Sequence, residues 1–338
     1  MKILGIETSC DETAAAVVED GRRVLANAVY TQIDIHKLYG GVVPEIASRK
    51  HVEKISAVVE QALSESGLCA RDLDAVAVTY APGLIGALLS GVSFAKGYAY
   101  SASLPLIPVH HLRGHVAANY LTQPQLEPPF LALIVSGGHS HIVRVEGYTD
   151  YEILGRTHDD AAGEAFDKVA RILGIGYPGG QKVEALAGEG DPFALSLPHT
   201  KYPDAPYDFS FSGLKTNVIN QVHQAEMKGV PLPKADVAAS FCEAITSTLC
   251  EHFLAAAKDL GEKTLVLAGG VSANGILRRK ISQAAKEADC RLYMPELRYC
   301  GDNAAMIASQ GFYEAQAGRF AGLDLNAYAT MDIAEAVF

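Results

Sequence analysis

Two local patterns each occur twice along this chain, in the same order, and this repetition constrains the fold more than any other feature. The first pattern is an apolar run, a polar turn and a second apolar run, as in KILGIETSCDETAAAVVED near the start and FLALIVSGGHSHIVRVEG at residues 130–147. It is typical of a β-hairpin. The second is a strand, a glycine-containing turn and a helix, at residues 74–100 and again at 263–281. Aligning Ile6 with Ile134 places Asp11 opposite His139, so the repetition predicts two related halves.

Strand, turn and helix units of this kind build α/β folds with parallel strands. We therefore expect a duplicated α/β protein with two lobes that face a cleft, and with the paired turns lining that cleft. The first lobe is expected over residues 1–120 and the second over 121–338, with a C-terminal helix that could return to the first lobe. An insertion near residues 150–230 is rich in Gly, Pro, Asp and aromatic residues and contains one probable helix, in DDAAGEAFDKVARILG.

Composition excludes several classes of protein. The start of the chain has no secretory pattern, and no stretch approaches the roughly 20 apolar residues of a membrane-spanning helix, so we expect a cytoplasmic protein. The six cysteines include no C-x-x-C pair, which argues for buried thiols and against a disulfide framework or a zinc ribbon. A net charge of −11 means that a nucleic-acid partner would need a local basic patch or a helper subunit.

The segment VHHLRGHVAANY, residues 109–120, places two histidines four residues apart. If it is helical, His111 and His115 project from one face, one turn apart, as two ligands of one metal ion can. The alternative is a pair of capping or solvated histidines, and the spacing alone does not decide between them. A zinc protease of the H-E-x-x-H type would need a glutamate where Leu112 stands, which weighs against proteolysis.

Two imidazoles leave a first-row metal incompletely coordinated, so a carboxylate from elsewhere should complete the site. The best candidate is Asp302 in RYCGDNAAMIA, at the start of a helix of small residues. Its alternative role is that of a helix N-cap.

Glycine pairs follow two of the predicted strands, in SGGH at 136–139 and AGGVSAN at 268–274. Without a Cβ, backbone amides can approach a phosphate closely, and the N-terminus of the following helix attracts its charge. This favours nucleotide binding over simple turns, although neither a P-loop nor an N-terminal G-x-G-x-x-G motif is present.

Carboxylates provide the remaining candidates. Asp11 and Glu12 in ETSCDET stand beside Glu7, where they could position a metal, a water or an amine, or be ordinary solvated acids. Asp167 in AFDKVAR is either half of a surface ion pair or a ligand for ribose hydroxyls.

Taken together, the motifs closely resemble one known family, the tRNA threonylcarbamoyladenosine transferases (TsaD in bacteria, formerly described as O-sialoglycoprotein endopeptidases). The motifs are GIETSCDETA, GGVVPEIASRKH, APGLIGALLSG, PVHHLRGH, LIVSGGHS, DDAAGEAFDKVARILG, YPGG, DFSFSGLKT, AGGVSANGILR and GDNAAMIA. The series runs in order through nearly the whole chain.

The resemblance implies the duplicated actin, sugar-kinase and Hsp70-like (ASKHA) fold, and one divalent metal ion per chain, iron or zinc, on His111, His115 and Asp302. It implies that the adenylate part of the donor, threonylcarbamoyl-AMP, or another adenine nucleotide is held by Ile134, Val135, Ser136, Gly137, Gly138, Asp167, Gly180, Glu184 and Asn274. Asp11, Glu12 or His139 would accept the proton of the attacking amine, a role that requires hydrogen-bond reach.

The implied reaction is transfer of the threonylcarbamoyl group to the exocyclic amine of the adenosine 3′ to the anticodon, in tRNAs that read codons beginning with A. The implied partners are a TsaB-like paralogue, a TsaE-like ATPase and a TsaC-like enzyme that makes the donor. Two other classes stay open, a metal-dependent peptidase and a non-catalytic scaffold of the same fold.

Overall fold

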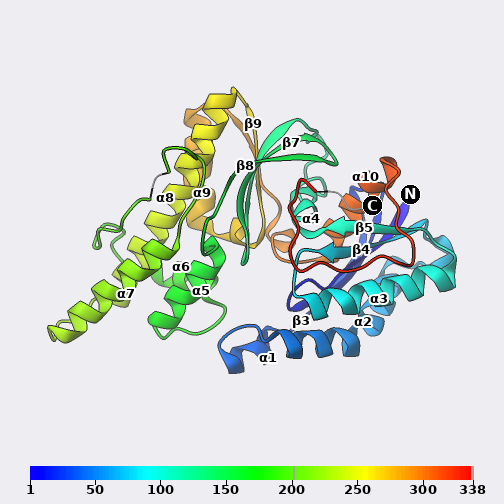
Figure 1. The fold of residues 1–338 in the computed structure, drawn as a ribbon, viewed down its shortest axis with the longest axis horizontal. Helices are drawn as coiled ribbons and strands as arrows, with labels where there is room; N and C mark the ends of the chain where they lie inside the picture. Colours follow the sequence, from blue (N-terminus) through cyan, green and yellow to red (C-terminus); the bar gives the residue numbers. More distant parts are fainter. Residues whose placement is uncertain (201, 336–338) are drawn as a thin grey trace. The chain divides into compact units, whose positions relative to one another are not determined.

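The computed structural model describes residues 1–200 and 202–335, and the chain divides into two compact units. Unit 1 comprises Met1–Pro129, Val145–Glu152 and Pro295–Phe338, and unit 2 comprises Phe130–Arg144 and Ile153–Met294. The sheets are built in the same way, as the ribbon in Figure 1 lets the reader follow.

The sheet of unit 1 has five strands in the order β3-β2-β1-β4-β5. Strands β1 (Lys2–Glu7), β2 (Glu12–Glu19) and β3 (Arg23–Thr31) form an antiparallel meander, and β4 (Ala75–Ala81) and β5 (Leu106–His110) continue the sheet in parallel with β1. The central strands β1 and β4 are mostly apolar because both faces of the sheet are covered.

Alternate residues of these strands pack into two different cores, as the two-residue period of a strand requires. Leu4 and Ile6 belong to the core beneath α2 (Pro44–Ser66) and α3 (Ile85–Ala102), whereas Ile3 belongs to the core beneath α10 (Ala304–Gln316). Helices α2 and α3 lie side by side in Figure 1. The short helices of this unit are α1 (Ile33–His36), η1 (Lys37–Tyr39), η2 (Ala70–Asp72), α4 (His111–Ala117) and η4 (Leu297–Tyr299).

Helix α10 approaches the sheet very closely at Gly5. A Cβ on Gly5 would lie 2.4 Å from the carbonyl oxygen of Ala304, a backbone atom that cannot rotate away. Since Gly5 lies in the middle of β1, only glycine lets the first turn of α10 rest on that strand. This contact fixes the distance between β1 and the segment that carries Asp302.

The sheet of unit 2 repeats the topology, in the order β10-β9-β6-β7-β8. Its strands are β6 (Phe130–Val135), β7 (Ser140–Gly147), β8 (Asp150–Arg156), β9 (Thr264–Ala268) and β10 (Arg291–Tyr293), with β9 parallel to both β6 and β10. Reading β6 to β10 in the places of β1 to β5 gives the same neighbours, which confirms the predicted duplication.

The helices of unit 2 include α8 (Lys234–Leu260) and α9 (Gly275–Glu287), which follow β8 and β9 as α2 and α3 follow β3 and β4, with η3 (Gly270–Ala273) before α9. Between β8 and α8 the chain adds α5 (Ala162–Ile172), α6 (Gly179–Ala187) and α7 (Ser212–Met227). The predicted helix in this stretch is therefore confirmed as α5.

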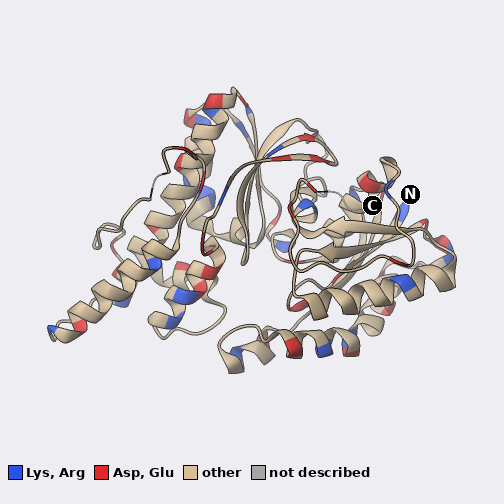
Figure 2. Ribbon diagram, in the orientation of Figure 1, with Lys and Arg blue, Asp and Glu red and all other residues tan. Residues whose placement is uncertain are grey.

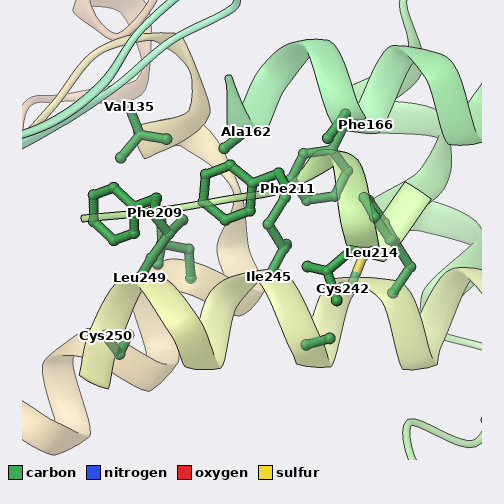
Figure 3. Packing of buried hydrophobic residues seen from close by; sticks show 14 of the residues in the cluster. Val135, Ala162, Phe166, Phe209, Phe211, Leu214, Cys242, Ile245, Leu249 and Cys250 are labelled. Atoms are coloured by element: carbon green, nitrogen blue, oxygen red, sulfur yellow. The ribbon is translucent and has the colours of Figure 1, made fainter. Parts of the chain in front are cut away.

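The segment before α7 is held to unit 2 by an aromatic pair. Phe209 and Phe211 are fully buried, with ring centroids 5.7 Å apart, and Figure 3 shows both rings between α8 and the ribbons near Val135. Ile245 and Leu249 of α8 belong to the same core. This packing anchors the segment before α7 in the core of unit 2.

Two further expectations can be compared with the structure. Cys242, Cys250 and Cys300 are buried, but Cys10 and Cys290 are half-buried and Cys69 is exposed, so the expectation of buried thiols is correct for only part of the set. Within residues 1–200 and 202–335, none of the helices combines the length and the apolar character needed to cross a bilayer. The lobe boundaries 1–120 and 121–338 stay a prediction.

Candidate metal and nucleotide sites

Helix α4 begins directly after β5, and this position sets the direction of both its metal-candidate histidines. His110 is the N-cap, because its Nδ1 accepts a hydrogen bond from the backbone N–H of Leu112. His111 and His115 follow on the next two turns, 7% and 1% exposed, so they are buried rather than solvated. Their ring centroids are 4.6 Å apart, which confirms that they share one face of the helix.

The start of α10 supplies the carboxylate. The N-cap of α10 is Asn303, whose Oδ1 accepts a hydrogen bond from the N–H of Met306, so Asp302 does not take the alternative role of the cap. Asp302 Oδ1 lies 3.2 Å from Nε2 of His115 and 3.5 Å from Nε2 of His111.

These spacings match those of ligands around one ion. Donor atoms held about 2.1 Å from a metal at tetrahedral angles are about 3.4 Å apart. The three candidate donors lie within 4.8 Å of one another, and this is the one group of its kind among the described residues. Within residues 1–200 and 202–335, Nδ1 of His115 is buried without a hydrogen-bond partner, and its Nε2 faces Asp302. Two imidazole nitrogens and one carboxylate oxygen form a donor set that fits iron or zinc.

A fourth residue, Glu7, contacts one of these candidate ligands. Glu7, at the end of β1, is fully buried, and its Oε2 lies 3.1 Å from Nδ1 of His111. Thr79 of β4 donates a hydrogen bond to the same Oε2 at 2.6 Å. The imidazole of His111 therefore has Asp302 at Nε2 and Glu7 at Nδ1.

The pKa values of the two histidines shift in opposite directions, because the acids Glu7 and Asp302 outweigh burial at His111 but not at His115. Burial lowers the pKa of His111, but Glu7 and Asp302 outweigh it and raise this pKa to about 9. Burial lowers the pKa of His115 below its ordinary value, and the nearby charge of His111 adds to the effect. Burial raises the pKa of Glu7, yet His111 holds it below the ordinary value. These shifts favour the protonated form at His111 and the neutral form at His115.

The turn after β1 carries the remaining acids of this unit. Asp11 is 6% exposed and its Oδ2 is buried without a hydrogen-bond partner. Burial, then Asp11 and Asp302, raise the pKa of Glu12 well above its ordinary value. The turn is fixed by His51 of α2, whose Nε2 lies 2.9 Å from the carbonyl oxygen of Cys10 and whose Nδ1 lies 2.8 Å from Thr13 Oγ1.

In unit 2, the turn after β6 is packed against the N-terminus of α5. The N–H groups of Gly163 and Glu164 donate to the carbonyl oxygens of Ser136 and Gly137. Gly137 and Gly138 are exposed, and a Cβ on either would meet nothing within 4 Å. Ile134 and Val135 have no exposed surface, so Ser136, Gly137 and Gly138 are the part of the predicted stretch that a ligand can reach.

The other predicted adenylate residues are joined by hydrogen bonds within unit 2. Asp167 Oδ1 accepts from the N–H of Gly179, which precedes Gly180, and Glu184 Oε1 accepts from the N–H of Gly275. Asn274 caps α9 by accepting from the N–H of Leu277. The structure thus gives Asn274 and Glu184 a role at the start of α9, a helix terminus of the kind that binds phosphate.

His139, the third candidate base, lies in unit 2 and is half-buried, with its ring stacked on His141 at 5.8 Å. Its backbone N–H donates to Ser136 Oγ. Asp11 and Glu12 lie in unit 1.

Comparison with known proteins shows the family to which the chain belongs. The family model of the tRNA N6-adenosine threonylcarbamoyltransferases (TsaD) matches residues 23–309, well over half of the chain. A curated relative of that name from Caldicellulosiruptor bescii is 50% identical over 94% of both chains, and one from Clostridium perfringens is 49% identical over 98% of both. The chain belongs to this family.

Solved structures agree on the fold of this TsaD-family protein. Full-length HypF has a TM-score of 0.61 at 15% identity, over 93% of this chain and 55% of the other, and a ROK hexokinase from Thermus thermophilus has 0.50 at 15% identity, over 94% and 100%. A likeness at this identity concerns the fold alone. It confirms the ASKHA fold that the family resemblance implies, and with it the duplicated α/β fold predicted from the repeated motifs.

Sequence reasoning gave no definite role to three residues around the metal candidates of this TsaD-family protein: Glu7, Thr79 and Arg113. A signal exists for the first two, since each is a polar residue in a strand that is otherwise apolar and buried, and such a residue needs a partner. Arg113 is 2% exposed and donates to the carbonyl oxygen of Ile333, so α4 is tied to the end of the chain. No sequence pattern reveals that contact.

Proposed function

We propose that this protein transfers the threonylcarbamoyl group from threonylcarbamoyl-AMP to the exocyclic amine of the adenosine 3′ to the anticodon, in tRNAs that read codons beginning with A. Family membership over most of the chain supports the reaction. The observation that carries the site is the convergence of His111, His115 and Asp302 on one point inside a member of that family.

We propose that these three residues hold one divalent ion, iron or zinc. When bound, such an ion polarises a carbonyl oxygen and offsets the negative charge that develops on it as a nucleophile attacks. The imidazoles that would bind the ion are buried, and Asp302, whose side chain is 20% exposed, is the residue of the group that meets solvent.

The proton has to leave the attacking amine. In the proposed step the amine nitrogen bonds to the carbamoyl carbon, the bond from that carbon to the phosphate oxygen of AMP breaks, and the amine proton passes to a base. Asp11 is the best candidate because its buried Oδ2 lacks a hydrogen-bond partner. Glu12, with its raised pKa, suits a group that holds a proton, and His139 is the third candidate.

In unit 2 we propose that the exposed amides of Gly137 and Gly138, with Ser136, bind the phosphate of the adenylate. Asp167, Gly180, Glu184 and Asn274 would receive its ribose and base. Carboxylates suit ribose hydroxyls, and the N-terminus of α9 suits an anion. Ile134 and Val135 would act by supporting the turn.

The macromolecular substrate is tRNA, and the acidic chain makes a helper plausible on physical grounds. Figure 2 shows acidic and basic residues interspersed along α2 and α8. On α9, Lys280 pairs with Glu243 at 2.7 Å and Arg278 donates to the carbonyl oxygen of Ser272, so this basic stretch is partly engaged within unit 2. We propose that a TsaB-like paralogue and a TsaE-like ATPase assist, and that a TsaC-like enzyme supplies the donor.

The peptidase alternative is not favoured, because Leu112 is an apolar residue, 1% exposed, where that chemistry needs a glutamate base. The scaffold alternative is not favoured either, because a scaffold has no need of a buried His-His-Asp group.

The test is a reconstitution with labelled threonylcarbamoyl-AMP, the TsaB-like and TsaE-like partners and tRNA. We expect label in a tRNA that reads a codon beginning with A, and none in a tRNA that reads another codon. H115A and D302A should abolish transfer, whereas N303A, which removes only a cap, should retain it. Transfer by H115A at the rate of the unmodified chain would contradict the proposed metal site, and no transfer by the unmodified chain would contradict the proposed reaction.

A further inference from the structure

Glu7 is a carboxylate with no exposed surface at the end of an apolar strand. An ionised carboxylate in such surroundings is costly unless charged or hydrogen-bonding groups surround it. The neighbours of Glu7 therefore show what this buried charge does.

Both oxygens of Glu7 are engaged. Oε1 accepts a hydrogen bond from the backbone N–H of Ser9, and Oε2 accepts one from the hydroxyl of Thr79 while lying 3.1 Å from Nδ1 of His111. Three elements meet here: β1 and the turn after it, β4, and α4. The carboxylate is thus fixed in rotation, with one oxygen directed at one imidazole nitrogen.

An imidazole whose Nδ1–H donates to a carboxylate presents Nε2 to whatever lies on its other side. On that side of His111 lies Asp302 Oδ1, at 3.5 Å from Nε2. Nε2 of His111 is thus the nitrogen that faces Asp302, the carboxylate of the candidate metal group. His115 has no such support, since its Nδ1 is buried and without a partner.

We propose that Glu7, itself held by Thr79, is the positioning residue that fixes the ring orientation and the Nε2 donor of His111 for metal binding. This inference rests on the proposed metal site. Carboxylates behind metal-binding histidines raise the basicity of the ligand, and their removal typically weakens metal binding about 10–100-fold.

A second neighbour of His111 could be confused with this role. Ser9 Oγ also lies 3.2 Å from Nδ1 of His111. A hydroxyl is a weaker partner than a carboxylate, because bonds to a charged acceptor are about twice as strong as neutral ones. The S9A variant therefore separates the two, and we expect it to change metal affinity less than E7Q does.

The experiment titrates the metal-free full-length protein with Co²⁺, whose visible absorption bands report the geometry of the bound ion. We expect E7Q to weaken Co²⁺ binding about 10–100-fold and to alter the bands, because an amide cannot accept from Thr79, Ser9 and His111 all at once. E7D, which keeps the charge on a shorter side chain, should recover part of the affinity. T79V, which removes only the hydroxyl that holds Glu7, should weaken binding to a smaller extent.

The matched control is T246V in unit 2. Thr246 is as buried as Thr79, and its hydroxyl donates to the carbonyl oxygens of Cys242 and Glu243. T246V should bind Co²⁺ as the unmodified chain does. Circular dichroism of each metal-free variant shows whether it is folded.

The outcomes are distinct. If the unmodified chain binds no Co²⁺, the proposed metal site is wrong. If it binds Co²⁺ and the E7Q and T79V variants show the same affinity and the same bands, the role of Glu7 is overturned. If metal-free E7Q is unfolded, T79V decides, since it keeps the charge of Glu7 and loses only the contact that orients it.

Discussion

Asp302 and Asn303 are neighbours with separate tasks at the start of α10: Asn303 caps the helix, and Asp302 places Oδ1 3.2 Å from Nε2 of His115. Because the cap is supplied by the next residue, the carboxylate is available to the histidine pair. A substitution of Asp302 should therefore affect metal binding and leave the capping of α10 intact. A substitution of Asn303 should do the reverse.

We expect D302A to reduce metal affinity by more than about 100-fold, because it removes a proposed ligand. Removal of a residue that only supports a ligand typically costs about 10–100-fold. The thermal stability of the metal-free protein should change little. N303A should cost about 1 kcal/mol of stability through loss of the cap and should keep metal binding. Metal titration and thermal unfolding of both variants check this, and a reversed pattern would contradict the division of tasks.

Helix α10 rests on β1 at Gly5, so we expect a single methyl group added at Gly5 to lower the stability of the protein. G5A should destabilise the protein by at least about 2 kcal/mol, since the added Cβ would meet a backbone oxygen and overpack the interface. G97A is the matched control, because Gly97 is exposed in α3 and a Cβ there meets nothing within 4 Å. G97A should be neutral or stabilising by up to about 1 kcal/mol. Denaturant unfolding of the two variants measures the difference.

His51 predicts a dependence of stability on acid. Burial, its largest influence, lowers the pKa of His51 below 6.5 in the folded protein. A depressed pKa means that the unfolded chain binds the proton more readily, so this contribution to stability is present above pH 6.5 and is lost as the pH falls through the folded pKa. In H51Q, whose side chain does not titrate, the unfolding free energy should fall less steeply below pH 6.5. Equal slopes in the two proteins would exclude this role.

Arg113 predicts coupling between α4 and the end of the chain. It is buried, pairs with Glu314 at 3.2 Å and donates to the carbonyl oxygens of Ile333 and Glu335. R113M should cost about 3–5 kcal/mol, because it leaves a buried carboxylate with one partner fewer. Deletion of residues 331–338 should also destabilise the protein, and the two changes combined should cost at least about 1 kcal/mol less than their sum. Strict additivity, measured by denaturant unfolding, would show that the contact carries little energy.

Much of the fold could be predicted because the patterns are local and repeated. The hairpins at β1-β2 and β6-β7, and the strand, turn and helix units at β4-α3 and β9-α9, follow from hydrophobic periodicity and glycine placement. The grouping of residues 295–338 with unit 1 depends on contacts of high sequence separation, such as that between Gly5 and Ala304, which a single sequence does not display.

The candidate sites were predictable to different degrees. The spacing of His111 and His115 indicated a shared face, and Asp302 could be named only as the best carboxylate. Glu7 could be named only as one of the acids of ETSCDET, because its contact with His111 joins residues that are 104 positions apart in the sequence. For Asn274, the resemblance suggested a ligand, while the structure shows a helix cap whose side chain already has a partner.

The tie between Arg113 and Ile333 has a consequence for how this protein is made. The helix with both histidines is translated before unit 2, whereas Asp302 and the residues that hold Arg113 are translated after it. While unit 2 is translated, a nascent chain therefore contains His111 and His115 but not yet the carboxylate of Asp302. The three candidate donors His111, His115 and Asp302 can therefore come together only after unit 2 has been translated.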